Sequence, residues 1–192
     1  EAVQAAKEAA GDRMAVLAKL NMDDGVPGGF WLDESVAVAR MLEADGALDA
    51  LELTGGSSFE NPMYLFRGDS PIKEFSAAFK PPLRWGMRMT GTSFLREYPY
   101  RDAFLMRDAE QFRRELTMPL ILLGGITNRE TMDRAMEAGF DFVAMGRALL
   151  AEPDLINRIR ADGAVQSVCD HCNKCMPTIY SRTHCVVTGG PA

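Results

Sequence analysis

The stretch that decides the fold runs from residue 119 to residue 147 and contains two short apolar segments that each end in glycine. They are Pro119-Leu120-Ile121-Leu122-Leu123-Gly124-Gly125-Ile126 and Gly139-Phe140-Asp141-Phe142-Val143-Ala144-Met145-Gly146-Arg147. Between them, residues 128–138 have the spacing of one amphipathic helix. A strand–helix–strand unit of this length makes a parallel pair. Both glycine turns are therefore expected at the same, C-terminal edge of one sheet.

The two glycine turns are candidates for binding a phosphate group. Glycine lets backbone N–H groups approach an anion closely, and arginine can pair with a phosphate through two parallel hydrogen bonds. In (β/α)₈ barrels the loops after strands seven and eight commonly hold a phosphate. The candidate site is Gly124, Gly125, Gly146 and Arg147. The alternative is that the glycines only turn the chain and that Arg147 makes a surface ion pair.

Composition and charge exclude several classes of protein. The 192 residues are 47% hydrophobic and 25% charged, which is typical of a globular domain, and the net charge of −6 opposes binding to nucleic acid. Apolar runs are far shorter than the ~18 residues that cross a bilayer, and the first residues lack a secretory signal pattern. We therefore expect a cytoplasmic protein with neither a membrane nor a nucleic-acid partner.

The order of the expected elements indicates an α/β fold, namely the C-terminal half of a TIM (β/α)₈ barrel. A complete barrel takes about 250 residues, whereas this chain offers four strand–helix units and begins inside a helix without an initiator methionine. Two open sheet edges would then lack partners. We expect a homo-oligomer or pairing with the missing N-terminal half. The expected strands are residues 14–20, 48–54, 119–123 and 140–145, and the expected helices are residues 1–10, 34–44, 104–116, 128–138 and 149–160.

This interpretation divides the chain into two parts. Residues 1–165 form the barrel half, within which residues 59–104 are a long insertion or loop rich in proline, methionine and aromatic residues. A segment of this length in a compact domain is usually functional or carries small elements of its own. Residues 166–192 form a cysteine-rich tail.

Lys19 is a charged residue inside the otherwise apolar segment 14–20. Charged side chains are rarely buried without a partner. One interpretation is that Lys19 points into the barrel mouth, where a fixed positive charge suits a cofactor ring that becomes anionic on reduction. The other is a structural ion pair with Glu52 or another acid at a strand end.

The tail contains all four cysteines of the chain, in the pattern Cys-x2-Cys-x2-Cys-x9-Cys, and both histidines, His171 and His184. Three cysteines at this spacing can wrap an iron–sulfur cluster with a fourth ligand from further along the chain, and four thiolates can equally hold Zn²⁺. Four unliganded thiols are the third possibility. The candidate metal ligands are Cys169, Cys172, Cys175 and Cys185.

Taken together, several of these motifs resemble the Old Yellow Enzyme family of FMN-dependent NAD(P)H oxidoreductases. The resemblance covers most of the chain, and its most specific part is the block Ala144-Met145-Gly146-Arg147-Ala148-Leu149-Leu150-Ala151-Glu152-Pro153. It is carried further by Ala18-Lys19-Leu20-Asn21, Thr54-Gly55-Gly56 and Leu122-Leu123-Gly124-Gly125-Ile126. The cysteine tail is similar to that of the branch with 2,4-dienoyl-CoA reductase and trimethylamine dehydrogenase.

The resemblance implies a barrel with FMN at its mouth and hydride transfer from NAD(P)H, through the flavin, to an activated alkene or a similar small-molecule electron acceptor. Lys19 would lie near the flavin N1/O2 edge, the glycines and Arg147 would bind the FMN phosphate, and Met145 could touch the flat cofactor. In the cysteine-bearing branch a comparable cysteine set holds a [4Fe–4S] cluster. The family's catalytic acid lies in the first half of the barrel, so no catalytic residue is assigned.

Two other functions share parts of this pattern. A barrel enzyme acting on a sugar phosphate would explain the glycine turns and leave the cysteine tail without a role. A truncated, metal-stapled domain without catalytic activity would explain the cysteines.

Overall fold

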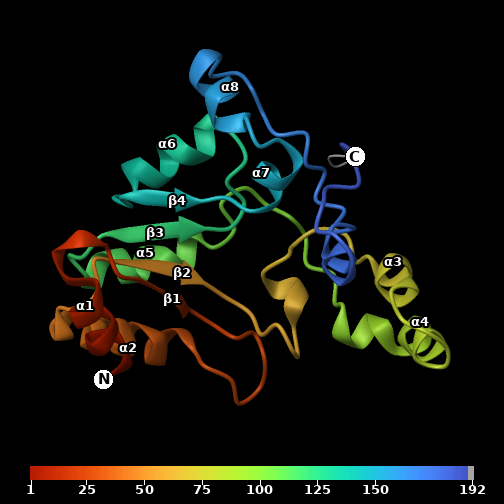
Figure 1. Cartoon of the computed structure of the whole chain (residues 1–192), viewed down its shortest axis with the longest axis horizontal. Coiled ribbons are helices and arrows are strands. Elements are labelled where there is room, and N and C mark those ends of the chain that lie inside the picture. Colours follow the sequence, from red (N-terminus) through yellow and green to blue (C-terminus); the bar gives the residue numbers. More distant parts are fainter. Residues whose placement is uncertain (190–192) are drawn as a thin grey trace.

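The computed structural model describes residues 1–189, so the last three residues of the predicted tail, 190–192, lie outside the described residues. Four strands form one parallel sheet in chain order (Figure 1). They are β1 Leu17–Asn21, β2 Ala50–Thr54, β3 Leu120–Leu123 and β4 Phe142–Ala144. The predicted α/β class is confirmed, and β3 and β4 end at the same edge of the sheet, as the motif pattern requires.

The helices follow the predicted order, with one difference in the last one. The predicted helix 149–160 is two helices, because Pro153 disfavours helical backbone at the preceding residue, and Glu152 is extended (φ −140°, ψ 86°). The helices are α1 Ala2–Ala10, α2 Leu32–Asp45, α3 Ile72–Ala77, α4 Leu83–Phe94, α5 Met106–Glu115, α6 Arg129–Glu137, α7 Arg147–Ala151 and α8 Leu155–Ala161, with short 3₁₀ turns η1 Gly11–Arg13, η2 Pro62–Tyr64 and η3 Met176–Tyr180.

The hydrophobic core lies on one face of the sheet. The strand residues that alternate toward this face are fully buried leucines from β2 and β3, Leu51, Leu53, Leu120 and Leu122. They pack in one cluster with Ala39 of α2, Phe112 of α5 and Ala135 of α6. Burying side chains of this size contributes roughly 1.5–3 kcal/mol each, so this cluster fixes where the strand ends lie.

The opposite face of the sheet is uncovered along its edge strands, β1 and β4. Its register aligns Lys19, Glu52, Ile121 and Phe142 in one row across the four strands. Leu17 and Phe142, at its two edges, are 54% and 56% exposed. An open parallel sheet is unusual, because parallel sheets are normally covered on both faces.

The predicted insertion at 59–104 is not a bare loop, because it carries η2, α3 and α4. The α3–α4 hairpin lies away from the sheet and beside the tail (Figure 1). Its contact with the tail is aromatic: the ring centroids of Phe75 and Phe79 lie 6.0 and 5.3 Å from that of Tyr180 in η3. The insertion and the tail, which are distant in the sequence, thus pack together.

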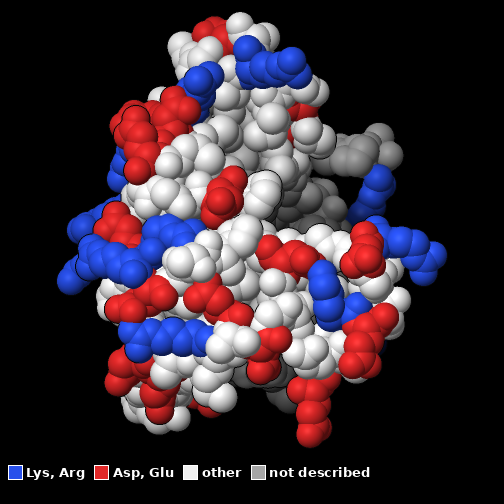
Figure 2. All heavy atoms as spheres, turned by 90° about the vertical axis from the view of Figure 1, so that its left-hand side faces the viewer, with Lys and Arg blue, Asp and Glu red and all other residues white. Residues whose placement is uncertain are grey.

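The surface on the side of α1, α5 and α6 carries both signs of charge. Figure 2 shows lysine and arginine interspersed with aspartate and glutamate, without a continuous basic area on this side. Within residues 1–189, none of the helices has the length and apolar composition that would let it cross a bilayer.

Glu43 ties α2 to the start of β3, and this contact makes folding stability depend on pH. Its carboxylate accepts hydrogen bonds from Met118 N (2.6 Å) and Thr117 N (2.7 Å). Burial alone would raise the pKa of Glu43. These hydrogen bonds outweigh the effect of burial and hold the pKa below its usual 4.5. The folded state therefore binds fewer protons than the unfolded state, so this stabilisation is present above about pH 4.5 and is lost as the pH falls through the lower folded pKa.

We expect Glu43→Gln to reduce the free energy of unfolding by about 1 kcal/mol at neutral pH, because a neutral amide then replaces the charged carboxylate as the acceptor of these hydrogen bonds. Urea unfolding at neutral pH and at a pH below 4 measures the difference, which should shrink in acid. Glu8→Gln, on the exposed face of α1, is the control. A difference that stays constant across this range would contradict the role of the carboxylate.

Candidate functional site

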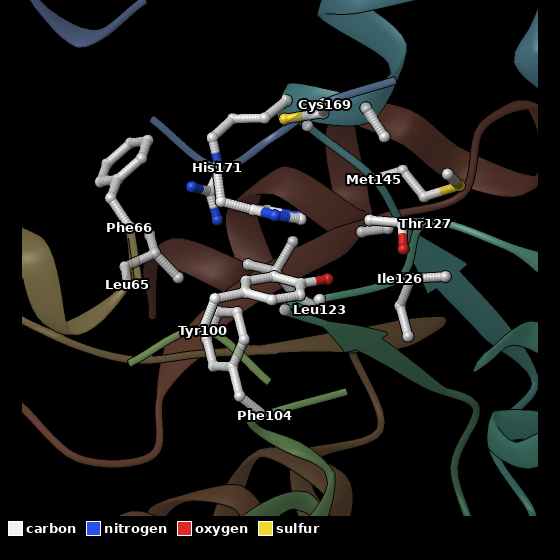
Figure 3. A pocket seen from close by; sticks show the side chains of 16 residues that line it. Leu65, Phe66, Tyr100, Phe104, Leu123, Ile126, Thr127, Met145, Cys169 and His171 are labelled. Carbon is white, nitrogen blue, oxygen red and sulfur yellow. The ribbon is translucent and has the colours of Figure 1, made fainter. Parts of the chain in front are cut away.

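A cavity of about 190 Å³ opens at the C-terminal edge of β3 and β4 (Figure 3). We call it the mouth cavity. Four segments that are far apart in the sequence meet there. Its lining includes Gly124, Gly125 and Thr127 after β3; Met145, Gly146 and Arg147 after β4; Phe66, Tyr100 and Phe104 from the insertion; and Cys169 and His171 from the tail. Five of the six predicted cofactor-binding residues therefore line one cavity.

The three glycines of the cavity differ in what they require. Gly124 and Gly125 have φ values of 101° and 75°, and a Cβ on Gly125 would lie 2.7 Å from Ala103 N and 2.8 Å from Arg101 O. Close packing of the chain against residues 101–103 therefore already requires glycine at 125. Gly146 is different, because its φ is −106° and an added Cβ would meet no protein atom within 4 Å. The space beside Gly146 is open to a ligand.

Arg147 is held by neutral groups rather than by an ion pair. Its Nη1 donates to Arg67 O at 2.9 Å and to the Oδ1 of Asn173. Within residues 1–189, Nε and Nη2 have no hydrogen-bond partner and no carboxylate lies within ion-pair distance. In the part of the chain that the structure describes, Arg147 therefore does not make the surface ion pair of the alternative interpretation. Burial lowers the pKa of Arg147, which reflects the cost of keeping this charge away from water.

Tyr100 and His171 form a stacked pair on the wall of the mouth cavity, with ring centroids 3.4 Å apart and an angle of 19° between the rings (Figure 3). Burial raises the pKa of Tyr100 to about 12, and its hydroxyl donates to Asp102 Oδ1 at 2.9 Å. Burial and the nearby Arg147 lower the pKa of His171, which favours the neutral ring. Neither residue was predicted as part of the site, because the contact joins positions 71 residues apart and leaves no local pattern.

Lys19, the sixth predicted residue, does not line the mouth cavity. Its side chain is 69% exposed, and its Nζ lies 2.8 Å from Glu52 Oε1 on the uncovered face of the sheet. This is the ion pair that the sequence offered as the second interpretation. The role of Lys19 beside a flavin stays a prediction.

The four cysteines surround a second, smaller cavity, which we call the cysteine cavity. Arg147 and Asn173 line it together with Cys169, Cys172, Cys175 and Cys185. The cysteines are free thiols, and burial raises the pKa of Cys169, Cys172 and Cys175. In residues 1–189, no group of three or more Cys, His, Asp or Glu side chains is arranged to hold a metal ion. Metal binding by the gathered cysteines stays a prediction.

Glu152, from the most specific motif, anchors the tail beside the mouth cavity. It is buried, and its Oε2 accepts a hydrogen bond from Val168 N at 2.6 Å while its Oε1 pairs with Arg158. Nearby, Ser167 N donates to Thr127 O at 3.0 Å, directly after the first glycine turn. These contacts direct the chain so that Cys169 and His171 reach the cavity wall.

Sequence relatives of this chain are oxidoreductases. No protein-family model matches the sequence. Over 185 residues, the chain is 51% identical to the 4,4'-dithiodibutanoate disulfide reductase of Rhodococcus erythropolis. The matched region covers 96% of this chain and 46% of that protein. It is 25% identical over 155 residues to an NADH oxidase of Thermoanaerobacter brockii, across 80% of this chain and 19% of that protein. Both relatives are oxidoreductases, and the chain spans less than half the length of each.

A solved structure shares the fold. The chain resembles 2-naphthoyl-CoA reductase, determined in complex with 2-naphthoyl-CoA, with a TM-score of 0.68 over 96% of this chain and 24% of that one. The sequence identity is 16%, so the likeness concerns the fold alone.

Because its pKa is raised, Tyr100 should ionise at a higher pH in the folded protein than in the unfolded protein. Between pH 9 and about 11 the native Tyr100 should stay protonated, so native wild-type protein and Tyr100→Phe should gain equal phenolate absorbance. In concentrated urea the wild type should gain one additional tyrosine. Ultraviolet absorbance titration of both proteins makes the comparison. A native Tyr100→Phe protein that already lacks one tyrosine's signal below pH 11 would show that the ring is not buried as described.

Proposed function

We propose that the chain is the cofactor-phosphate-binding half of an FMN-dependent NAD(P)H oxidoreductase. The observation that carries this proposal is the convergence of both glycine turns and Arg147 on one cavity at the C-terminal edge of adjacent parallel strands. The residues fit a phosphate in two respects. Gly146 leaves open space beside its backbone. Among the described residues, the Nε–Nη2 edge of Arg147 has no partner and can make two parallel hydrogen bonds.

The proposed architecture is the second half of a (β/α)₈ barrel. Support comes from four parallel strands in chain order, the packing of α2, α5 and α6 against one face of the sheet, and sequence relatives more than twice as long as this chain. The mouth cavity of about 190 Å³ is smaller than the roughly 300–1,000 Å³ of a complete small-molecule site. In this proposal the present residues hold the phosphate end of the cofactor, and strands from outside the chain complete the site.

When bound, FMN supplies the two-electron chemistry that accepts a hydride from NAD(P)H and passes it to an acceptor. The residues of this chain supply charge, orientation and exclusion of water. Arg147 offsets the phosphate charge, Met145 offers an apolar contact to the cofactor, and the Tyr100–His171 stack closes one wall. Lys19 would add a positive charge on the face of the sheet that the barrel interior would occupy.

For the acceptor we favour an organic disulfide over an activated alkene, because the 51% identical relative is a disulfide reductase. The net reaction balances simply. One NAD(P)H, one proton and one disulfide give NAD(P)⁺ and two thiols, as the hydride's two electrons break the S–S bond. Steady-state assays on the same preparation compare NADH with NADPH as the reductant, and a disulfide with an alkene as the acceptor.

The experiment that tests the proposed function is the visible spectrum of the purified protein, with iron and zinc assayed on the same sample. We expect a two-banded flavin spectrum. For the cysteine cavity we propose an iron–sulfur cluster, which would add a broad shoulder and about four irons per chain; one zinc without the shoulder would replace that assignment. A colourless protein that does not take up FMN would overturn the proposed function and return attention to a sugar-phosphate ligand.

Gly146→Ala distinguishes a ligand-binding glycine from a structural one. Because the added methyl meets no protein atom within 4 Å, the free energy of unfolding should stay within about 0.5 kcal/mol of the wild type. FMN affinity should fall at least about tenfold if the phosphate approaches this backbone. Flavin fluorescence titration measures the affinity. Gly163→Ala is the matched control, since its added Cβ also meets no atom within 4 Å. Unchanged affinity in Gly146→Ala would remove Gly146 from the site.

The proposed half barrel should not be a lone monomer. Open edges at β1 and β4 and the exposed Leu17 and Phe142 favour association with a second sheet. Light scattering of a protein with this chain alone should give a dimer or larger species. A monodisperse monomer would contradict this proposal without affecting the phosphate site.

A further inference from the structure

Within residues 1–189, the protein occupies one edge of the Arg147 guanidinium and leaves the other edge without a partner. Both hydrogens on Nη1 are used, one on Arg67 O at 2.9 Å and one on the Oδ1 of Asn173. The remaining donors, on Nε and Nη2, form the edge that pairs with phosphate in parallel hydrogen bonds. The direction of this free edge therefore depends on what holds Nη1.

Asn173 is built to hold Nη1 in one position. It is 1% exposed, and its Nδ2 donates to Phe66 O and, at 3.0 Å, to Asp69 O. With both amide hydrogens on carbonyls, Oδ1 can only face the arginine. Its φ of 56° lies in the left-handed region, which asparagine tolerates better than most residues.

The segments that Asn173 joins are far apart in the sequence. Arg67 O and Phe66 O belong to the insertion, Arg147 follows β4, and Asn173 belongs to the tail between Cys172 and Cys175. Arg147 also lines both the mouth cavity and the cysteine cavity. One amide therefore connects the tail to the guanidinium beside the glycine turns.

We propose that Asn173 is a positioning residue for the cofactor phosphate: it fixes Arg147 so that the Nε–Nη2 edge faces the mouth cavity. The cysteine-bearing tail is then part of the phosphate site, although it does not touch the phosphate. This inference rests on the proposed function, because it names a second residue for the same phosphate contact.

The test compares FMN with riboflavin, which has the same ring system and lacks the phosphate. Asn173→Gly removes the amide and tolerates the positive φ, so it separates the side chain from the backbone conformation. Thr178→Val is the matched control in the tail: Thr178 is buried and its hydroxyl donates to Cys175 O, with no contact to Arg147. Affinities are measured by flavin fluorescence titration, together with the unfolding midpoint of each variant.

We expect Asn173→Gly to weaken FMN binding about tenfold and to leave riboflavin binding unchanged, with Thr178→Val changing neither. Arg147→Ala should weaken FMN about 10- to 100-fold, and adding Asn173→Gly to it should cause no further loss, because both act on one contact.

Three outcomes would overturn the inference. Equal weakening of FMN and riboflavin would mean that Asn173 supports the fold only. A double variant whose losses add would mean that Asn173 does not act through Arg147. Full FMN affinity in Asn173→Gly would mean that Arg147 needs no such support. Failure of the proposed function is recognised separately, because the unaltered protein would then bind neither flavin, or Arg147→Ala would bind FMN as well as the wild type.

Discussion

The parallel pairing of β3 with β4 is the constraint on which the site depends. Two strands joined by α6 must run in the same direction, so the turns at Gly124-Gly125 and Gly146 end at one edge. The buried leucines of β3 and the covering helices fix this edge from one side. With the strand ends fixed, Arg147 emerges beside the first glycine turn. No other element needs to place it there.

What the sheet does not fix is the direction of the arginine side chain. A half-buried guanidinium loses hydrogen bonds to water. Where no carboxylate is near, only neutral acceptors can replace those hydrogen bonds. Arg67 O and Asn173 Oδ1 provide such acceptors on one edge. A carboxylate in their place would neutralise the charge and compete with any anionic ligand. Neutral acceptors leave the positive charge available, which is the property that an anion site requires.

The sequence predicted the parts of the site that obey local rules. Residues 119–147 identified the strands, the helix and five residues of the mouth cavity, because period and glycine position are local signals. Tyr100, His171 and Asn173 follow no such rule, since each acts through contacts with distant segments. The break between α7 and α8 has a local signal in the sequence, because Pro153 disfavours helical backbone at Glu152. The anchoring of the tail by the buried Glu152 has no such signal.

The face of the sheet opposite the core differs in polarity between its two halves. On this face the register begins with Leu17 beside Ala50, continues with Lys19 beside Glu52, and ends with Asn21 beside Thr54. Along β1 and β2 the face therefore changes from apolar to polar toward the edge at which the mouth cavity opens. Its β3–β4 half is apolar throughout, with Ile121, Leu123, Phe142 and Ala144. If further strands covered this face, the Lys19–Glu52 pair would lose water, and a buried pair keeps its charges only when other groups complete its hydrogen bonds. An electron-rich cofactor edge or a polar residue from the covering strands could complete those bonds. In this structure Lys19 is 69% exposed and Glu52 14%, so it is mainly the lysine that has water to lose.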